Sequence, residues 1–385
     1  MPFPKKRLLT PGPTQVPETA LLSLARQVTH HRTPESYAEF AAVLEGLKDV
    51  FQTRSDVVVL AGSGTAGMEA AMVNLVPRGR KAIVLNAGVF AQRWAKIAAA
   101  YEIDVVEHRV EWGKPVEAAD VAALLKAHPD AVGVFGTLME SSTGVAHDVR
   151  AIAKVVAPTD AVFVVDAISG AGVQECRMDA WGIDVLVVGG QKALMLPPGL
   201  AIVAASAKAW AAMERCKAQA FYLNLLSHRK KLAEGPTTPW TPAHTLIGAL
   251  HETLKIILAR GMDRVWSDAR TLGAATRAGL KELGWECFAA RPADGMTAAK
   301  VPDGIDAGRF LKAMETDYGV KLASGQLDLK GKIIRIAHMG IIDELDILSV
   351  LSAMELTLAG LCRPIEFGQA VGAASRVMFE AKKQT

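Results

Sequence analysis

The sequence has 385 residues, of which 50% are apolar and 22% are charged, with a formal net charge of +3 at pH 7. This length is too great for one hydrophobic core, so we expect a large domain and a smaller one. Because the net charge is small and the basic residues are scattered, neither nucleic acid nor an anionic membrane surface is an expected partner.

The N-terminal stretch MPFPKKRLLTPGPT has no apolar run long enough for a signal peptide, and no segment approaches the about 20 apolar residues of a membrane span. The four cysteines, Cys176, Cys216, Cys287 and Cys362, lie far apart and form no Cys-x-x-Cys pair. This spacing is typical of reduced thiols and not of a zinc site. We therefore expect a cytoplasmic protein without a metal site.

From Asp56 to about Ala205, short β-branched runs such as VVVL and AIVL alternate with Ala-rich helical stretches. The later runs AVFVVDA, VLVVGG and LAIVAAS are apolar throughout, as expected when helices cover both faces of a parallel sheet. After Trp210 the pattern is mainly helical, with a short strand KIIRIAH and a final helix near 343–361. We predict an α/β fold with a large domain over 1–260, built on a mainly parallel sheet, and a smaller C-terminal α/β domain over 261–385.

The loop LAGSGTAGMEAA carries the pattern G-x-G-x-x-G between a predicted strand and a predicted helix. A dinucleotide-binding fold would place Asp or Glu at the end of the next strand, where this chain has Asn86. The hydroxyls of Ser63 and Thr65 beside Gly64 suit a phosphate monoester at the N-terminus of a helix. Phosphate binding is the favoured interpretation, and a dinucleotide site or a plain tight turn are the alternatives.

Asp166 ends one apolar run, and Lys192 follows the next run, 26 residues later. Taken alone, Asp166 is an ordinary turn or helix-cap residue and Lys192 an ordinary surface lysine. Because the C-terminal ends of parallel strands face one crevice, we expect the two side chains to meet there. A partly desolvated lysine can form a Schiff base, and a carboxylate can hold a pyridine nitrogen protonated. With the phosphate loop, these groups suit an aldehyde cofactor that has a pyridine ring and a phosphate.

The motifs HHRTPESY, GSGTAGMEAA, ESSTG, VVDAISG, GGQKALMLPPGLA and IIRIAHMG follow one another in this order. With them the chain resembles the class V aminotransferases of pyridoxal-phosphate (PLP) fold type I, which include alanine–glyoxylate, serine–glyoxylate and serine–pyruvate aminotransferases. It is most similar to the branch labelled soluble hydrogenase small subunit. The resemblance implies PLP fold type I, pyridoxal 5′-phosphate as cofactor, and a homodimer with shared active sites.

The resemblance also implies roles for individual residues. Lys192 would form the Schiff base and move the proton, and Asp166 would pair with the pyridinium nitrogen. Arg335 would grip the α-carboxylate of the substrate, with a surface arginine on a strand as the alternative. Further cofactor contacts are implied for Ser63, Gly64, Thr65 and Gln191 at the phosphate, Phe90 and Ile168 on the two faces of the ring, Ser141 at the phenolic oxygen or ring, and Thr238 and Thr241 at the phosphate of the neighbouring subunit's cofactor.

The sequence thus predicts an aminotransferase that moves an amino group from alanine or serine to glyoxylate or pyruvate by a ping-pong mechanism. One arginine for an α-carboxylate, and none assigned to a second carboxylate, favours small monocarboxylic substrates. The alternatives are a PLP-dependent lyase of the cysteine desulfurase kind, a nicotinamide oxidoreductase, and a non-catalytic subunit associated with a hydrogenase. A desulfurase needs a reactive cysteine on a mobile loop, whereas Cys362 follows a predicted helix beyond Arg335, which counts against this alternative.

Overall fold

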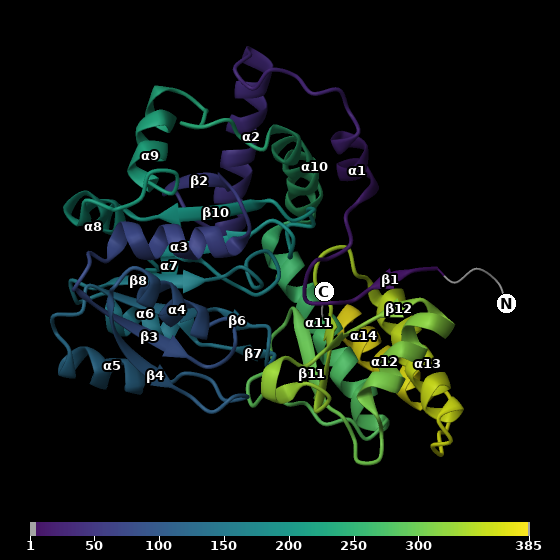
Figure 1. Ribbon diagram of the computed structural model, residues 1–385. Helices are drawn as coiled ribbons and strands as arrows, with labels where there is room; N and C mark the ends of the chain where they lie inside the picture. Colours follow the sequence, from purple (N-terminus) through teal and green to yellow (C-terminus); the bar gives the residue numbers. More distant parts are fainter. Residues whose placement is uncertain (1–4, 384–385) are drawn as a thin grey trace.

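A computed structural model describes residues 5–383, and a seven-stranded sheet forms the centre of its N-terminal part (Figure 1). Its strands are β2 (Asp56–Ala61), β3 (Lys81–Asn86), β4 (Asp104–Arg109), β5 (Gly133–Thr137), β8 (Val162–Asp166), β9 (Val185–Gly189) and β10 (Leu200–Ala205). They lie in the order β2-β10-β9-β8-β5-β3-β4. From β9 to β4 all neighbours are parallel, which confirms the predicted mainly parallel sheet.

Strand β10 is the exception, because it runs antiparallel to both β9 and β2. The connection between β9 and β10 covers only residues 190–199. A crossover between two parallel strands needs a dozen or more residues, so this short connection must return the chain in the opposite direction. Lys192 lies within this return loop, just beyond the edge where the parallel strands end.

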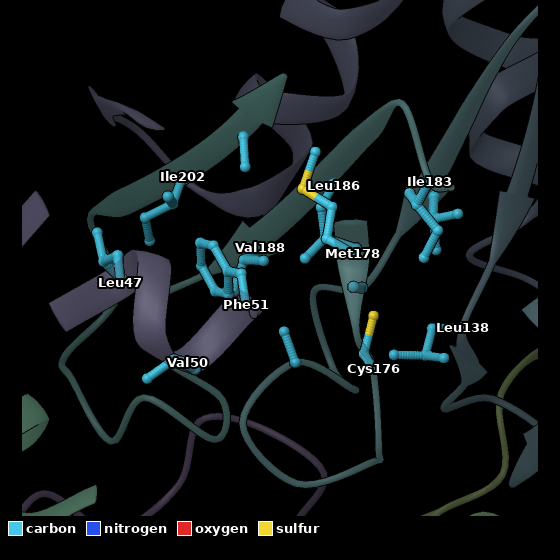
Figure 2. Close-up of a cluster of buried hydrophobic side chains, with 14 of the residues drawn as sticks. Leu47, Val50, Phe51, Leu138, Cys176, Met178, Ile183, Leu186, Val188 and Ile202 are labelled. Atoms are coloured by element: carbon cyan, nitrogen blue, oxygen red, sulfur yellow. The ribbon is translucent and has the colours of Figure 1, made fainter. Parts of the chain in front are cut away.

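Both faces of the sheet are buried, which explains the uninterrupted apolar runs. On β9, Leu186 and Val188 belong to one core with Phe51 and Leu47 (Figure 2), whereas Val185 and Val187 belong to the core on the other face. The helices of this part of the chain are α1 (Glu18–Leu24), α2 (Pro34–Phe51), α3 (Gly64–Leu75), α4 (Gln92–Ala100), α5 (Ala118–Ala127), α6 (Val149–Val156), α7 (Met178–Trp181), α8 (Ala207–Cys216), α9 (Leu225–Glu234) and α10 (His244–Arg260). A short hairpin of β6 (Met139–Glu140) and β7 (Val145–Ala146) lies beyond β5.

The C-terminal part, green and yellow in Figure 1, has a core of its own. A three-stranded antiparallel sheet is formed by β11 (Met296–Lys300), β14 (Ile333–Ala337) and β13 (Ala323–Ser324). Around it lie α11 (Met262–Glu282), α12 (Ala307–Tyr318), the 3-10 turn η1 (Leu327–Leu329), α13 (Glu344–Gly360) and α14 (Gln369–Lys382). The prediction that the chain ends with the helix near 343–361 was wrong, because α14 follows it and packs against α11.

The N-terminal segment crosses to the C-terminal part. Strand β1 (Arg7–Leu8) pairs in parallel with β12 (Val320–Lys321), and Leu9 belongs to the C-terminal core. Residues 10–14 therefore pass between the two parts of the molecule. Gly261, with a φ of +79°, separates α10 from α11. The division into 1–260 and 261–385 stays a prediction.

No helix within residues 5–383 is long and apolar enough to cross a membrane.

Candidate functional site

Asp166 and Lys192 come together at the C-terminal edge of the parallel strands. Asp166 is the last residue of β8, and Lys192 follows the end of the neighbouring strand β9 by three residues. Both line a cavity of about 100 Å³, which we call the inner cavity. It also receives six other residues that the sequence predicted for the site, namely Gly64, Thr65, Phe90, Ser141, Ile168 and Gln191.

A larger cavity of about 630 Å³, the outer cavity, shares Phe90, Ser141 and Lys192 with the inner one. Arg335 of β14 lines the outer cavity, so a strand of the C-terminal part faces the amine of the sheet domain. The N-terminal residues 10–13 form another part of its wall. Asp166 lines the inner cavity alone, and Arg335 lines the outer cavity alone.

The Lys192 side chain lies in a largely enclosed position. Its Nζ donates a hydrogen bond to the carbonyl oxygen of Pro11, and a Cβ at Gly12 would overlap this side chain. Thr14 secures the backbone, since its Oγ1 donates to the Lys192 oxygen at 2.8 Å. Burial lowers the pKa of Lys192 to about 8; the nearby Asp166 carboxylate opposes this effect, and the cationic Arg335 adds to it. About a tenth of this amine is therefore neutral, and hence nucleophilic, at pH 7.

The Asp166 carboxylate is buried, with 4% of the residue exposed. Oδ1 accepts a hydrogen bond from the backbone N–H of Ile168 at 2.9 Å, and no ion pair joins this carboxylate to a cation of residues 5–383. Burial raises its pKa to about 7, and the neighbouring Glu140 charge adds to the rise. The nearby charges of Arg93 and Lys192 oppose this rise. A buried carboxylate that makes no direct ion pair is a strong acceptor for a positively charged N–H donor.

The phosphate loop joins β2 to α3. A Cβ at Gly64 would lie 2.6 Å from the Ile168 side chain, so only glycine allows this close approach. The first backbone N–H groups of α3 have no partner within the helix and favour an anion. The Oε1 atom of Gln191 is buried without a hydrogen-bond partner among the described residues.

Arg335 is held by two carbonyl groups. Its Nη1 donates to the Ser141 oxygen at 2.7 Å and its Nε to the Ser324 oxygen at 2.9 Å. Burial lowers its pKa to about 10, so the guanidinium stays charged at neutral pH. Arg335 lies in the middle of β14 and not at its end, and the alternative of an exposed surface arginine is wrong, since only 7% of the residue is exposed.

Sequence reasoning missed two charged residues of the site. Glu140, within the ESSTG motif, is fully buried; its Oε2 accepts from the Ala91 N–H at 2.9 Å and its Oε1 from the Ser142 hydroxyl at 2.6 Å. It thus ties the loop that carries Phe90 to the turn that carries Ser141. Arg93, in the first turn of α4, lines the inner cavity. The only signal for either was proximity to a motif residue in the sequence.

Three predicted residues do not line either cavity. Ser63 is exposed at the N-cap of α3, where its side chain makes no capping hydrogen bond. Thr238 is buried in the loop before α10, and its Oγ1 donates to the Trp240 oxygen at 2.6 Å. Thr241 is exposed in the same loop. A role for these two threonines at the site of a neighbouring subunit stays a prediction.

No group of three or more His, Cys, Asp or Glu residues within the described range could hold a metal ion.

The class V aminotransferase family model matches residues 9–329 of this chain. The chain belongs to the class V aminotransferase family. A soluble hydrogenase small subunit from Synechococcus sp. is 38% identical over 98% of this chain and 99% of its own length. An L-aspartate–glyoxylate aminotransferase from Paracoccus denitrificans is 33% identical, covering 95% of this chain and 94% of the relative. A serine–glyoxylate aminotransferase from Hyphomicrobium methylovorum is 32% identical over 96% and 93%.

Among solved structures, pyridoxamine–pyruvate aminotransferase from Mesorhizobium loti superposes with a TM-score of 0.92 at 27% identity, over 98% of this chain and 97% of that one. The predicted fold type I architecture is thereby confirmed, and the family implies PLP as cofactor.

The residues of this class V aminotransferase fit that cofactor chemically. Lys192 provides a partly neutral amine for the aldehyde, and the unpaired Asp166 carboxylate provides a partner for a protonated ring nitrogen. Gly64 and Thr65 line the inner cavity at the first turn of α3, where a phosphate would be favoured. Each group therefore has a complement in the structure.

Proposed function

We propose that this aminotransferase transfers an amino group from a small amino acid, alanine or serine, to glyoxylate or pyruvate in two half-reactions. The observation that carries the proposal is the meeting of the Lys192 amine and the Asp166 carboxylate in one buried cavity, with Arg335 facing them from the C-terminal part. These three groups suit covalent attachment, electron withdrawal and capture of an α-carboxylate.

When bound, the cofactor would supply a pyridine ring that withdraws electrons from the substrate carbon. Asp166 would hold the ring nitrogen protonated, and Lys192 would take the proton from the substrate Cα and deliver it to carbon C4′ of the cofactor. Phe90 and Ile168 would enclose the ring, with Ser141 at its edge. The phosphate would be held by Ser63, Gly64, Thr65 and Gln191.

Arg335 can orient the substrate because a guanidinium binds a carboxylate through two parallel hydrogen bonds. Such a fixed carboxylate would set the Cα–H bond toward Lys192, which lines the same cavity. Glyoxylate and pyruvate are the acceptors in the names of three relatives, which supports a small 2-oxo acid here. The amino donors in those names differ. We propose alanine and serine because Arg335 is the one arginine assigned to a substrate carboxylate, which favours donors with a single carboxylate.

The rival functions have less support. Cys362 is exposed in the turn after α13 and lines neither cavity, so it gives no nucleophile for a desulfurase reaction. A purely structural role beside a hydrogenase would not require a desolvated amine opposite a buried carboxylate. Catalysis is therefore the better explanation of this site.

We also propose a homodimer with shared active sites. Thr238 and Thr241 lie outside the cavities of their own chain, as expected if they serve the phosphate site of a partner copy. The Thr29 hydroxyl lies 3.1 Å from Nε2 of His244, the first residue of α10, so the segment after α1 contacts the chain just beyond this loop. Sedimentation or light scattering of the cofactor-loaded protein tests the dimer, and a monomer with full activity would contradict it.

The proposed reaction is tested with a panel of donors and acceptors. We expect alanine or serine alone to convert the bound cofactor to its amine form, which removes the visible absorption band, and glyoxylate or pyruvate to restore that band. Aspartate and glutamate serve as the matched dicarboxylic donors. A protein that binds no PLP, or that releases ammonia or sulfide without needing a 2-oxo acid, would contradict the proposal.

Replacing Arg335 by Gln should lower kcat/KM for the amino donor by about 10- to 100-fold, the usual cost of losing hydrogen bonds to a charged group. The main effect should be on KM, because the α-carboxylate is bound before and during the reaction. Arg335→Lys keeps the positive charge but loses the planar guanidinium with its two parallel N–H donors, so its kcat/KM should lie between those of Arg335→Gln and the wild type. Steady-state kinetics over donor concentration measures this, and an unchanged KM in both variants would contradict the role.

The depressed pKa of Lys192 predicts how the cofactor-free protein takes up PLP. With a pKa of about 8, the neutral fraction of the amine should rise about tenfold from pH 7 to pH 9 and then level off, whereas an ordinary lysine would show about a hundredfold rise without levelling. Stopped-flow recording of the visible band gives the initial rate at each pH. A profile that still climbs steeply above pH 9 would show that burial does not depress this pKa.

A further inference from the structure

Arg93 is a cation of the inner cavity for which the reaction described above has no use. Its Nη1 donates to the Thr65 Oγ1 at 2.8 Å, and its guanidinium carbon lies 5.0 Å from the centre of the Phe90 ring. The side chain is half-buried and lines the same cavity as Lys192 and Asp166. It therefore stands between the phosphate loop and the aromatic residue proposed to cover the ring.

Among residues 5–383 this guanidinium makes no ion pair or hydrogen bond with a carboxylate, although its charge lowers the pKa of the Asp166 carboxyl across the inner cavity. The carboxylate of Glu140 is occupied by backbone and hydroxyl donors of the 90–91 and 142 segments, and Asp166 accepts from the Ile168 N–H. A partly desolvated cation without a directly bonded counter-charge is unfavourable, and an anion placed beside it is correspondingly stabilised. We therefore expect a negatively charged group of a bound ligand to lie beside Arg93.

The position of Thr65 indicates where that negative group would lie. Thr65 is in the first turn of α3, whose N-terminal N–H groups favour an anion at the same place. Because Arg93 already donates to the Thr65 hydroxyl, a phosphate bound at this turn would lie within reach of the guanidinium, which binds phosphate through a planar fork.

We propose that Arg93 is a further cofactor-binding residue, which binds the phosphate group of the cofactor together with the Ser63–Thr65 turn. The inference rests on the proposed PLP-dependent function and extends it. Between the two half-reactions the cofactor carries the amino group and has no covalent link to Lys192. Arg93 would then be one of the groups that keep the cofactor in the protein, and its loss should release the amine form most readily.

The test compares two aldehydes that differ only in the phosphate. Pyridoxal 5′-phosphate and pyridoxal are titrated into cofactor-free wild-type protein, Arg93→Gln and Arg93→Lys, with the visible band as readout, and pyridoxamine 5′-phosphate is titrated by calorimetry. Lys96→Gln, an exposed residue one turn along α4, removes the same charge as a control. Circular dichroism verifies the fold of each variant.

We expect Arg93→Gln to weaken binding of both phosphorylated forms by about 10- to 100-fold while pyridoxal affinity stays within about twofold, because only the phosphate loses a charged hydrogen bond. Arg93→Lys should lie between, and Lys96→Gln should match wild type. Equal weakening of pyridoxal and its phosphate would assign Arg93 a packing role on Phe90 and overturn the inference. Unchanged affinity would also overturn it, whereas a wild-type protein that binds none of these compounds would overturn the proposed function itself.

Discussion

Replacing Lys192 by Ala is expected to lower the transamination rate by about 10⁴-fold or more, because a positioned acid–base group alone contributes about 10²- to 10⁴-fold and the covalent attachment is lost as well. The visible band of bound PLP should disappear on dialysis. The fold should persist, since Thr14 holds the Lys192 and Gln191 backbone oxygens and not the side chain. Single-turnover kinetics with alanine and glyoxylate measures the loss.

Two further variants make this result interpretable. Lys192→Met keeps most of the length of the side chain without the amine, so it should fail in the same way even if Ala disturbs the packing against Gly12. Lys154→Ala removes an exposed lysine of α6 and should retain the band and the activity. If the Lys192 variants kept a dialysis-resistant band, another amine would carry the cofactor and the proposed site would be wrong.

The meeting of Asp166 and Lys192 could be predicted because it depends on one rule only, that parallel strands end at the same edge of a sheet. The structure adds the register: Asp166 lies beside Val187 of β9, and the chain then continues to Lys192. The antiparallel β10 was not predicted, although the ten residues between β9 and β10 are too few for a crossover. Connection length was the signal available for it.

The roles of Arg93 and Glu140 could not be read from the sequence. A polar residue in the first turn of a helix or next to a strand end is usually exposed, and only the packing of the 86–93 and 138–146 segments brings these two inward. The contribution of Pro11 depends on β1 pairing with β12, more than 300 residues away in the sequence. Such a long-range contact leaves no local pattern.

Helix α14 was missed for a related reason. Its buried residues are mostly alanines, Ala370, Ala373 and Ala374, which give a weak apolar stripe. Gly279 of α11 allows the close approach, because a Cβ there would lie 2.9 Å from the Ala370 oxygen. Helices that pack through small residues look polar in the sequence, and the partner that selects them is visible only in the fold.

Replacing Asp166 by Asn should lower activity by about 10²- to 10³-fold, the usual effect of removing one preorganised charge that stabilises a transition state. Asn cannot keep the ring nitrogen protonated, so the electron-withdrawing form would be lost while PLP still attaches to Lys192. The visible band should therefore remain, in contrast to the Lys192 variants. Asp166→Glu keeps the charge at a shifted position and should retain more activity than Asn.

The same Asp166→Asn substitution should stabilise the cofactor-free protein above pH 7. The pKa of Asp166 is about 7 in the folded protein and 3.8 in the unfolded chain. The contribution of this carboxyl to the free energy of unfolding is therefore fully present below pH 4 and is lost as pH rises toward 7. This loss is at most about 4 kcal/mol, from about 1.4 kcal/mol per unit. Urea denaturation at pH 5 and pH 8 should show a wild-type midpoint that falls relative to the Asn variant at pH 8, and added PLP should reduce the difference. Equal midpoints at both pH values would mean that Asp166 is not buried as a charge, and its proposed pairing with the ring nitrogen would lose its physical basis.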